Sequence, residues 1–230
     1  MYFCHSMEIW RDYPELVPGV ILADGITKEA TTREQAAKFD AIAESRLATS
    51  SEGELPEIRA WRRTFSAMGL KPTQYRCASE SLLRRFRQER SLPRLHPLID
   101  LCNSVSLAFA IPVAVFDVSK ITDFIEVRYA VGSEVYLAFS GEIEHPNHRE
   151  VIFADGSGRA HARRWTNRQS GYSAVRDDTS TVLIVVEAMH SAAHADVQSL
   201  TAALADELKA TWSIAARSAI LSNLSPRFEF

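Results

Sequence analysis

This chain of 230 residues has few cysteines and no long apolar run, and both features limit its class. The three cysteines, Cys4, Cys77 and Cys102, are odd in number and far apart, which excludes a disulfide framework and favours a reducing compartment. No stretch reaches the roughly 18 apolar residues that a membrane span requires, and the first residues lack the pattern of a signal peptide. We therefore expect a cytoplasmic protein with no membrane partner.

The familiar motifs of cofactor and metal chemistry are also missing. There is no G-x-x-x-x-G-K-[ST] loop and no nucleophile elbow, and residues 155–159 (DGSGR) fit a hairpin turn better than a dinucleotide fingerprint. His190 and His194 have the i, i+4 spacing of zinc-protease helices, but the glutamate of that motif is absent. We predict no metal site and no cofactor.

Arginine, in contrast, is abundant and unevenly placed. The chain has 21 arginines but only five lysines, and its net charge is −3. Residues 59–94, the first basic segment, carry nine arginines and one lysine against two glutamates. Residues 159–170, the second basic segment, carry four arginines and no acid. Two positive regions in an acidic protein suggest an anionic partner.

The periodicity of the apolar residues changes in the middle of the chain. Helical spacing predicts helices over residues 32–47, 56–68, 73–90, 98–109 and 197–212, with Thr32 as an N-cap for the first. Alternating patterns predict strands over residues 16–24, 113–118, 125–129, 135–139, 151–154, 159–165 and 181–189. This order predicts an α+β fold with a mixed or antiparallel sheet and a C-terminal amphipathic helix. We expect an N-terminal extension (1–56), one domain (57–216) and a frayed tail (217–230).

The basic segments admit two interpretations. On the predicted helices, the arginines lie on the face opposite the apolar stripe. That face is either simply solvated or a surface that contacts RNA phosphates. The candidates for RNA contact are Arg62, Arg76, Arg84 and Arg85. Arg76 and Glu80, at i and i+4, equally fit a helix salt bridge. In the second segment, arginines beside Trp165 could bind phosphate while the indole stacks on a base, although a strand tryptophan is more often core.

Four runs of the sequence resemble a known family. They are LHPLIDLCNSVSLAFAIPVAVFD (95–117), KITDFIEVRYAVGSEVYLAFSGE (120–142), EVIFADGSGRAHARRWTNRQSGY (150–172) and DDTSTVLIVVEAM (177–189). Together they resemble the B3/B4 domain of the bacterial phenylalanyl-tRNA synthetase beta subunit. The resemblance rests on a spaced set comprising Asp100, Asn103, Pro112, Phe116, Asp117, Arg128, Glu134, Asp155 and Thr179. It covers residues 59–189, and the other synthetase domains are absent from this chain, so it is not a full synthetase.

In that family the domain is an editing site that hydrolyses tyrosine wrongly attached to the tRNA for phenylalanine. The resemblance therefore implies a hydrolase that edits an aminoacylated tRNA 3′ end in trans, as a second sieve. Asn103 would orient the ester or the water, as the candidate catalytic residue. Substrate contacts would come from the second basic segment, through Arg163, Arg164, Trp165, Arg168, Gln169 and Ser170.

Three departures from the family pattern bear on activity. Cys102 replaces a threonine, Ala114 replaces a histidine, and Arg168 stands near the glutamate that reads the tyrosine hydroxyl. Tyrosine specificity does not follow, because a cation in place of an acid favours a different group. The alternative is a binding module without catalysis, holding tRNA, an amino acid or another small anion. No DNA partner is expected, and the oligomeric state is left open. Asp117, Arg128 and Glu134 also fit purely structural roles.

Overall fold

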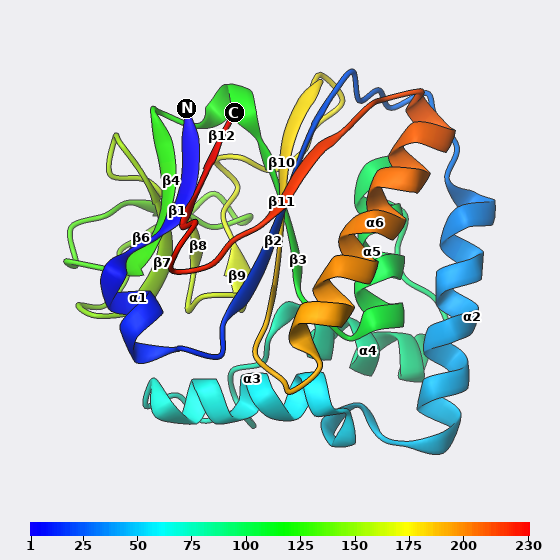
Figure 1. Cartoon of the computed structure of the whole chain (residues 1–230), viewed down its shortest axis with the longest axis horizontal. Coiled ribbons are helices and arrows are strands. Elements are labelled where there is room, and N and C mark those ends of the chain that lie inside the picture. The colour runs from blue at the N-terminus through cyan, green and yellow to red at the C-terminus, as the bar shows by residue number, and fades with distance from the viewer.

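The computed structural model describes residues 1–230 and contains two large sheets and one layer of helices (Figure 1). The helices are α1 Met7–Asp12, α2 Arg33–Thr49, α3 Pro56–Ala67, α4 Ala78–Glu89, α5 Pro97–Phe109 and α6 Ala193–Trp212, with 3-10 turns η1 Glu52–Glu54 and η2 Val118–Lys120. The predicted α+β class is confirmed, including the C-terminal amphipathic helix.

The strands form a six-stranded sheet, a four-stranded sheet and a short hairpin. The six-stranded sheet has the order β12 Arg227–Glu229, β1 Tyr2–His5, β4 Phe124–Tyr129, β7 Val151–Asp155, β8 Ala160–Arg163 and β9 Arg168–Gln169. The four-stranded sheet has the order β11 Arg217–Ile220, β2 Val17–Asp24, β10 Thr181–Ala188 and β3 Val113–Asp117. The hairpin joins β5 Tyr136–Leu137 to β6 Ile143–Glu144. Only β1 and β4 pair in parallel, so the sheets are mixed or antiparallel as predicted.

The four-stranded sheet is the middle layer of the molecule. Helices α2, α5 and α6 lie on one side of it, and the six-stranded sheet lies on the other (Figure 1). Strand β10 shows how the sequence produces this sandwich, because its side chains alternate between the faces. Val182, Ile184 and Val186 belong to the core under the helices, whereas Leu183 and Val185 belong to the core between the sheets. Glu187 continues the second series, so a carboxylate enters the core between the sheets.

One helix start and one helix cap differ from the sequence prediction. Helix α4 begins at Ala78, five residues after the predicted start, because the preceding chain is tied to the second basic segment: Ala78 N donates to Thr166 O (2.8 Å) and Asn167 Nδ2 donates to Arg76 O (2.7 Å). Thr32 precedes α2 but makes no capping hydrogen bond, since its hydroxyl donates to Pro97 O (2.9 Å).

The ends of the chain are part of both sheets, which corrects the expected frayed tail. Strand β12 pairs with β1 and β11 pairs with β2, so residues 217–229 extend the two sheets. At the other end, β1 pairs with β4 and contributes the fully buried Phe3 to the core between the sheets. Periodicity missed these strands because each has only three or four residues. No helix of the structure is long and apolar enough to cross a bilayer.

Phe228 on β12 tests whether the C-terminal strand is structural. Phe228 is 9% exposed and packs in the core between the sheets, so Phe228→Ala should lower the free energy of unfolding by about 2–4 kcal/mol. Leu224 is 93% exposed, and Leu224→Ala is the matched control, with an effect within about 0.5 kcal/mol. Urea denaturation measures both variants. Equal stability of the two would show that the C-terminal residues do not pack as described.

Candidate functional site

A small cavity lies between the two sheets and is closed at one end by the start of α4. Its walls come from β3, β7, β8, β10 and the turn after β8, and its volume is about 50 Å³. This inter-sheet cavity is lined by Ala78, Pro112, Val113, Ala114, Phe153, Ala162, Trp165, Thr166, Asn167, Arg168, Gln169, Val185 and Glu187. Two of these positions, Ala114 and Arg168, are where the resemblance places the family's editing histidine and tyrosine-reading glutamate.

Glu187 supplies the carboxylate of this otherwise mainly apolar cavity. Its Oε1 accepts hydrogen bonds from His5 Nε2 (2.7 Å) and Trp165 Nε1 (3.0 Å), and its backbone carbonyl accepts one from Trp61 Nε1 (3.3 Å). Oε2 makes no hydrogen bond within the protein, although Glu187 is only 2% exposed. Because Glu187 lines the cavity and its Oε2 has no partner in the protein, this oxygen is available to accept a hydrogen bond from a bound group.

Further polar atoms lie around the same cavity. Thr166 Oγ1 is buried and has no hydrogen-bond partner. Gln169 Nε2 donates to Val115 O (2.5 Å), which fixes the side chain. Gln169 also forms part of a larger groove of about 500 Å³, whose walls include His96, Phe139 and Arg176. The small cavity and the larger groove therefore adjoin at Gln169.

The three arginines predicted to contact substrate have different environments. Arg163 is 4% exposed and bonds Glu150 through Nε (2.8 Å) and Nη2 (2.9 Å), while its Nη1 contacts Glu144. Its guanidinium nitrogens are thus all bonded within the protein, which leaves no free donor for the predicted role of Arg163 in holding substrate. Arg168 also pairs with Glu144 (3.0 Å), but 40% of its side chain is exposed and it lines the cavity. Arg164 forms no salt bridge and lies over the Tyr75 ring at 4.8 Å.

The acidic partners of Arg163 are held in their charged form. Burial by itself would raise the pKa of Glu150, but the hydrogen bonds and charge of Arg163 outweigh it, so the pKa of Glu150 is lowered. The pKa of Glu144 is lowered in the same way, with Arg168 as the stronger of its two arginine partners. These carboxylates and arginines form an ion-pair network around the second basic segment, which leaves little free charge there.

Trp165 and Ser170 are buried, and this corrects their predicted roles. Trp165 is 0% exposed, and its ring makes edge contacts with Trp61 (5.3 Å between centroids) and Tyr13 (4.8 Å). No base can stack on an indole whose faces are covered in this way. Ser170 is also 0% exposed, and its hydroxyl donates to Leu137 O (3.0 Å). Trp165 borders the cavity as part of its wall and as a donor to Glu187.

Asn103 lies on α5, within the helical layer, and does not line the inter-sheet cavity. Its side chain is partly exposed and forms no hydrogen bond. The structure therefore does not bring Asn103 together with Trp165 and Arg168, and it gives no support to a catalytic role for Asn103. The neighbouring Cys102 is 2% exposed, and burial raises the pKa of its thiol to about 12. Cys102 is thus a protonated core residue at neutral pH.

The predicted RNA-contacting arginines of the first basic segment all have acidic partners. Arg62 (2.6 Å) and Arg76 (3.3 Å) pair with the fully buried Glu80, so the alternative interpretation of Arg76 as a helix salt bridge agrees with the structure. Arg84 pairs with the buried Glu52 (3.0 Å), and Arg85 pairs with Glu89 (3.0 Å). The charge summed over residues 59–94 overstated the free positive charge of this segment. Glu52, which pairs with Arg84, lies outside the residues that were summed.

The two basic segments do meet in space. Tyr75 lies under Arg164, and the turn at Thr166 binds the backbone before α4. A surface hollow of about 250 Å³ at this junction includes Arg164, Arg149, His148 and Tyr75. Neither Arg149 nor Arg164 forms a salt bridge, and the one acid of the hollow, Glu150, is neutralised by Arg163. This junction hollow thus contains two guanidinium groups, those of Arg149 and Arg164, that form no salt bridge and could contact an anion.

Other residues of the resemblance have structural roles. Asp117 accepts from Ser119 N (2.9 Å) and from Thr179 Oγ1 (2.8 Å), and Arg128 pairs with Glu134 (2.5 Å). Asp155 accepts from Ser157 N (3.0 Å) and Arg159 N (2.9 Å) in the hairpin turn predicted between β7 and β8. These residues hold turns and strands, which matches the structural alternative considered from the sequence.

Sequence reasoning missed Glu187 and His5. Glu187 is the single charged residue in the run TVLIVVEAM, and a charge inside an otherwise apolar strand was the available signal. His5 carried no signal, because its strand was not predicted and it lies 182 residues from Glu187. The histidine pair at 190 and 194 does not converge either, since His194 is exposed and His190 binds Asp196 (2.7 Å).

The chain matches a known protein family over most of its length. The model of the B3/4 domain matches residues 60–204, so the protein belongs to the B3/4 domain family. One solved structure similar to it is the crystal structure of an N-terminal fragment of the phenylalanyl-tRNA synthetase beta-subunit from Pyrococcus horikoshii, at 9% identity and a TM-score of 0.47. The alignment covers 96% of this chain and 54% of that one, so this chain spans about half its length. Comparison with the curated proteins finds no match.

Arg163 and Arg168 provide a test of the ion-pair network. Arg163→Ala leaves the buried Glu150 without its cation and Glu144 with Arg168 alone, and it should lower the free energy of unfolding by about 3–5 kcal/mol. Arg168→Ala removes a more exposed pair and should cost less than about 1 kcal/mol. Urea denaturation at pH 7 measures both. If Arg163→Ala proved as mild as Arg168→Ala, the network would not be the structural element described.

Proposed function

We propose that this B3/4 domain protein binds the aminoacylated 3′ end of a tRNA and hydrolyses its ester in trans. The observation that carries this proposal is the inter-sheet cavity, which contains the carboxylate of Glu187 together with Ala114 and Arg168, at or near the positions where the sequence resemblance implies editing residues. The acyl side chain enters the cavity and donates a hydrogen bond to Glu187 Oε2. The terminal nucleoside occupies the adjoining groove beyond Gln169, with His96 and Phe139.

The size of the cavity limits the acyl group. A cavity that holds benzene has a volume of about 150 Å³, whereas the inter-sheet cavity measures about 50 Å³. A phenylalanyl or tyrosyl side chain therefore does not fit without displacing its walls. A small side chain with a hydrogen-bond donor, of the size of serine or threonine, satisfies both the volume and Glu187. The proposed substrate is accordingly a tRNA that carries such an amino acid in error.

In the proposed reaction, water attacks the carbonyl carbon of the ester at the cavity mouth. The free hydroxyl of the terminal ribose accepts the proton of the water and passes its own proton to the neighbouring ester oxygen, because neither Asn103 nor a histidine lines the cavity. The tetrahedral intermediate then breaks its bond to the ribose oxygen, which takes up a proton. The products are a free amino acid and a tRNA with both ribose hydroxyls free. Arg168, at the mouth, is placed to stabilise the oxyanion.

A second candidate function is binding without hydrolysis. It is favoured by Ala114, which leaves no imidazole where the family has one, and by the two hydrogen bonds that already engage Glu187 Oε1. In this alternative the same cavity and groove retain a small amino acid or a charged tRNA end. The two candidates share the binding geometry and differ only in turnover.

Deacylation of a panel of aminoacyl-tRNAs tests the proposal. The wild type should release serine or threonine from tRNA faster than phenylalanine or tyrosine. Glu187→Gln should lower kcat/KM for the preferred substrate by about tenfold, because an amide in place of the carboxylate weakens a charge-assisted hydrogen bond. Glu142→Gln, on the exposed turn before β6, is the matched control and should retain full activity.

A third variant distinguishes hydrolysis from binding. Ala114→Leu fills the cavity and should abolish discrimination among acyl groups while tRNA affinity is retained. Salt-sensitive binding of tRNA without turnover of any substrate would support the binding module instead. If neither Glu187→Gln nor Ala114→Leu changed the rate of hydrolysis, the ester would be cleaved at another site. If the protein had no affinity for tRNA at low salt, both hydrolysis and binding of tRNA would be contradicted.

A further inference from the structure

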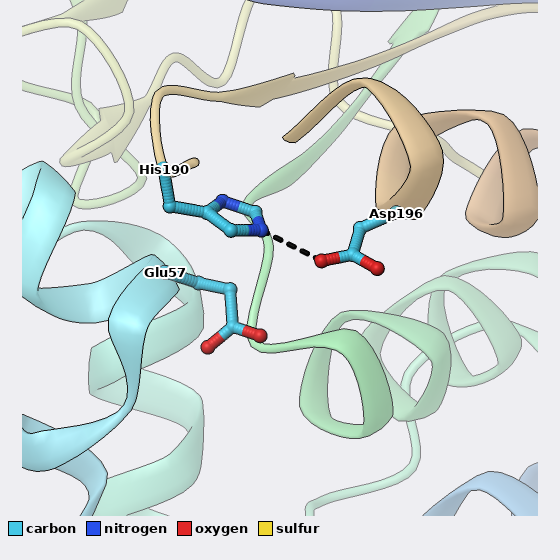
Figure 2. A group of neighbouring side chains, drawn as sticks. All are labelled: Glu57, His190 and Asp196. Atoms are coloured by element: carbon cyan, nitrogen blue, oxygen red, sulfur yellow. Dashed lines mark hydrogen bonds and ion pairs between the residues drawn. The ribbon is translucent and has the colours of Figure 1, made fainter. Parts of the chain in front are cut away.

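A second cluster of ionisable side chains lies away from the cavity, where the helical layer meets α3. His190 after β10 and Asp196 in the first turn of α6 point toward each other, and Glu57 in the first turn of α3 lies beside them (Figure 2). One ligand atom from each lies within 4.8 Å of the others. The three residues come from segments up to 139 positions apart, so the fold assembles them.

The cluster contains a buried oxygen that lacks a partner. Glu57 is 8% exposed, and its Oε2 is buried and makes no hydrogen bond. Its other oxygen, Oε1, accepts from Arg46 Nη2 (2.8 Å), and this bond fixes the carboxylate. Arg46 donates its Nη1 to Ala108 O (2.8 Å), so the guanidinium is anchored beside Oε1. One carboxylate oxygen of Glu57 thus remains without a proton donor or a cation.

His190 and Asp196 complete a donor set with an opening to solvent. The His190 side chain is 3% exposed, and its Nε2 lies 2.7 Å from Asp196 Oδ2. The Asp196 side chain is 37% exposed, so an ion or a water molecule can reach the cluster from that side. The cluster has two carboxylates, and the guanidinium of Arg46 is the one cation bonded to either of them besides the imidazole of His190. Arg46 then orients Glu57 without occupying its second oxygen.

We propose that Glu57, His190 and Asp196 bind a divalent transition-metal ion of the zinc class. One imidazole nitrogen and two carboxylate oxygens are ligands that zinc accepts, with water in the fourth position on the exposed side. Tetrahedral coordination at bond lengths of about 2.0–2.1 Å separates neighbouring ligand atoms by roughly 3.3 Å. The side chains reach that separation when Asp196 moves away from His190 and Glu57 moves toward it.

The expected role of the ion is structural. It joins the starts of α3 and α6 to the end of β10 and adds to the hydrogen bonds already present there, such as those from Trp61 Nε1 to Glu187 O (3.3 Å) and from Ala193 N to His190 O (2.9 Å). Bound metal stabilises the folded state in proportion to its affinity. The site is independent of the proposed deacylation, because none of its residues lines the inter-sheet cavity.

Metal binding by the purified, untagged protein after chelator treatment tests the proposal. Zn²⁺ titration should show a single binding event and raise the melting temperature, and Co²⁺ should give the intense visible absorption of a tetrahedral site. A Cys4→Ser background removes the partly exposed thiol as a competing ligand. His190→Gln should weaken binding by about 100-fold. His194→Gln, which removes an exposed imidazole four residues away, is the matched control and should bind as the wild type does.

A second variant covers the case in which His190→Gln fails to fold. Glu57→Gln retains an oxygen for Arg46 and should weaken binding by about tenfold or more, with an unchanged circular dichroism spectrum. Absence of a Zn²⁺-dependent rise in melting temperature in the wild type would overturn the proposal. The proposal would also be overturned if His194→Gln lost as much Zn²⁺ affinity as His190→Gln. The same holds if neither Glu57→Gln nor His190→Gln changed the Zn²⁺ affinity.

Discussion

Buried carboxylates need donors, and this requirement organises the chain. Glu80 takes two arginines of the first basic segment, Glu52 takes two from α4, and Glu150 takes Arg163. Glu187 instead accepts hydrogen bonds from the imidazole of His5 and the indole of Trp165. These bonds connect the N-terminal strand β1 and the turn after β8 to β10. Removing one partner of such a pair leaves an uncompensated charge in the interior. Most arginines are thus explained by salt bridges within the protein, and a smaller number remain available to contact an anionic partner.

This division of charge gives the two candidate regions different characters. The inter-sheet cavity is small and has one carboxylate, with one oxygen that has no partner in the protein. The junction hollow has Arg149 and Arg164, whose guanidinium groups form no salt bridge. An aminoacylated RNA end has both a small acyl group and phosphates, and the two regions lie on either side of the turn that contains Thr166. Family membership and this arrangement together support the proposed binding of a charged tRNA end.

The sequence predicted those features that depend on local pattern. Alternation in residues 181–189 identified β10, and helical spacing identified α3, α5 and α6, because one buried face imposes a period on the side chains. It could not predict β1 or β12, since strands of three or four residues carry no period. It also misjudged Arg62 and Arg84, whose partners Glu80 and Glu52 lie 18 and 32 residues away. Trp165 was predicted to stack on a base, whereas the structure buries its indole, because sequence alone does not show which aromatic side chains are covered.

The salt dependence of tRNA binding tests the central claim that most arginines are paired inside the protein. Only Arg59, Arg63, Arg159 and Arg164 in the two basic segments form no salt bridge, and each phosphate contact with single-stranded RNA contributes about −0.7 to the slope of log K against log salt concentration. The account predicts a slope between about −1 and −3. A slope of about −5 or steeper would contradict it, because that value requires the arginines paired with Glu52 and Glu80 to contact phosphate instead.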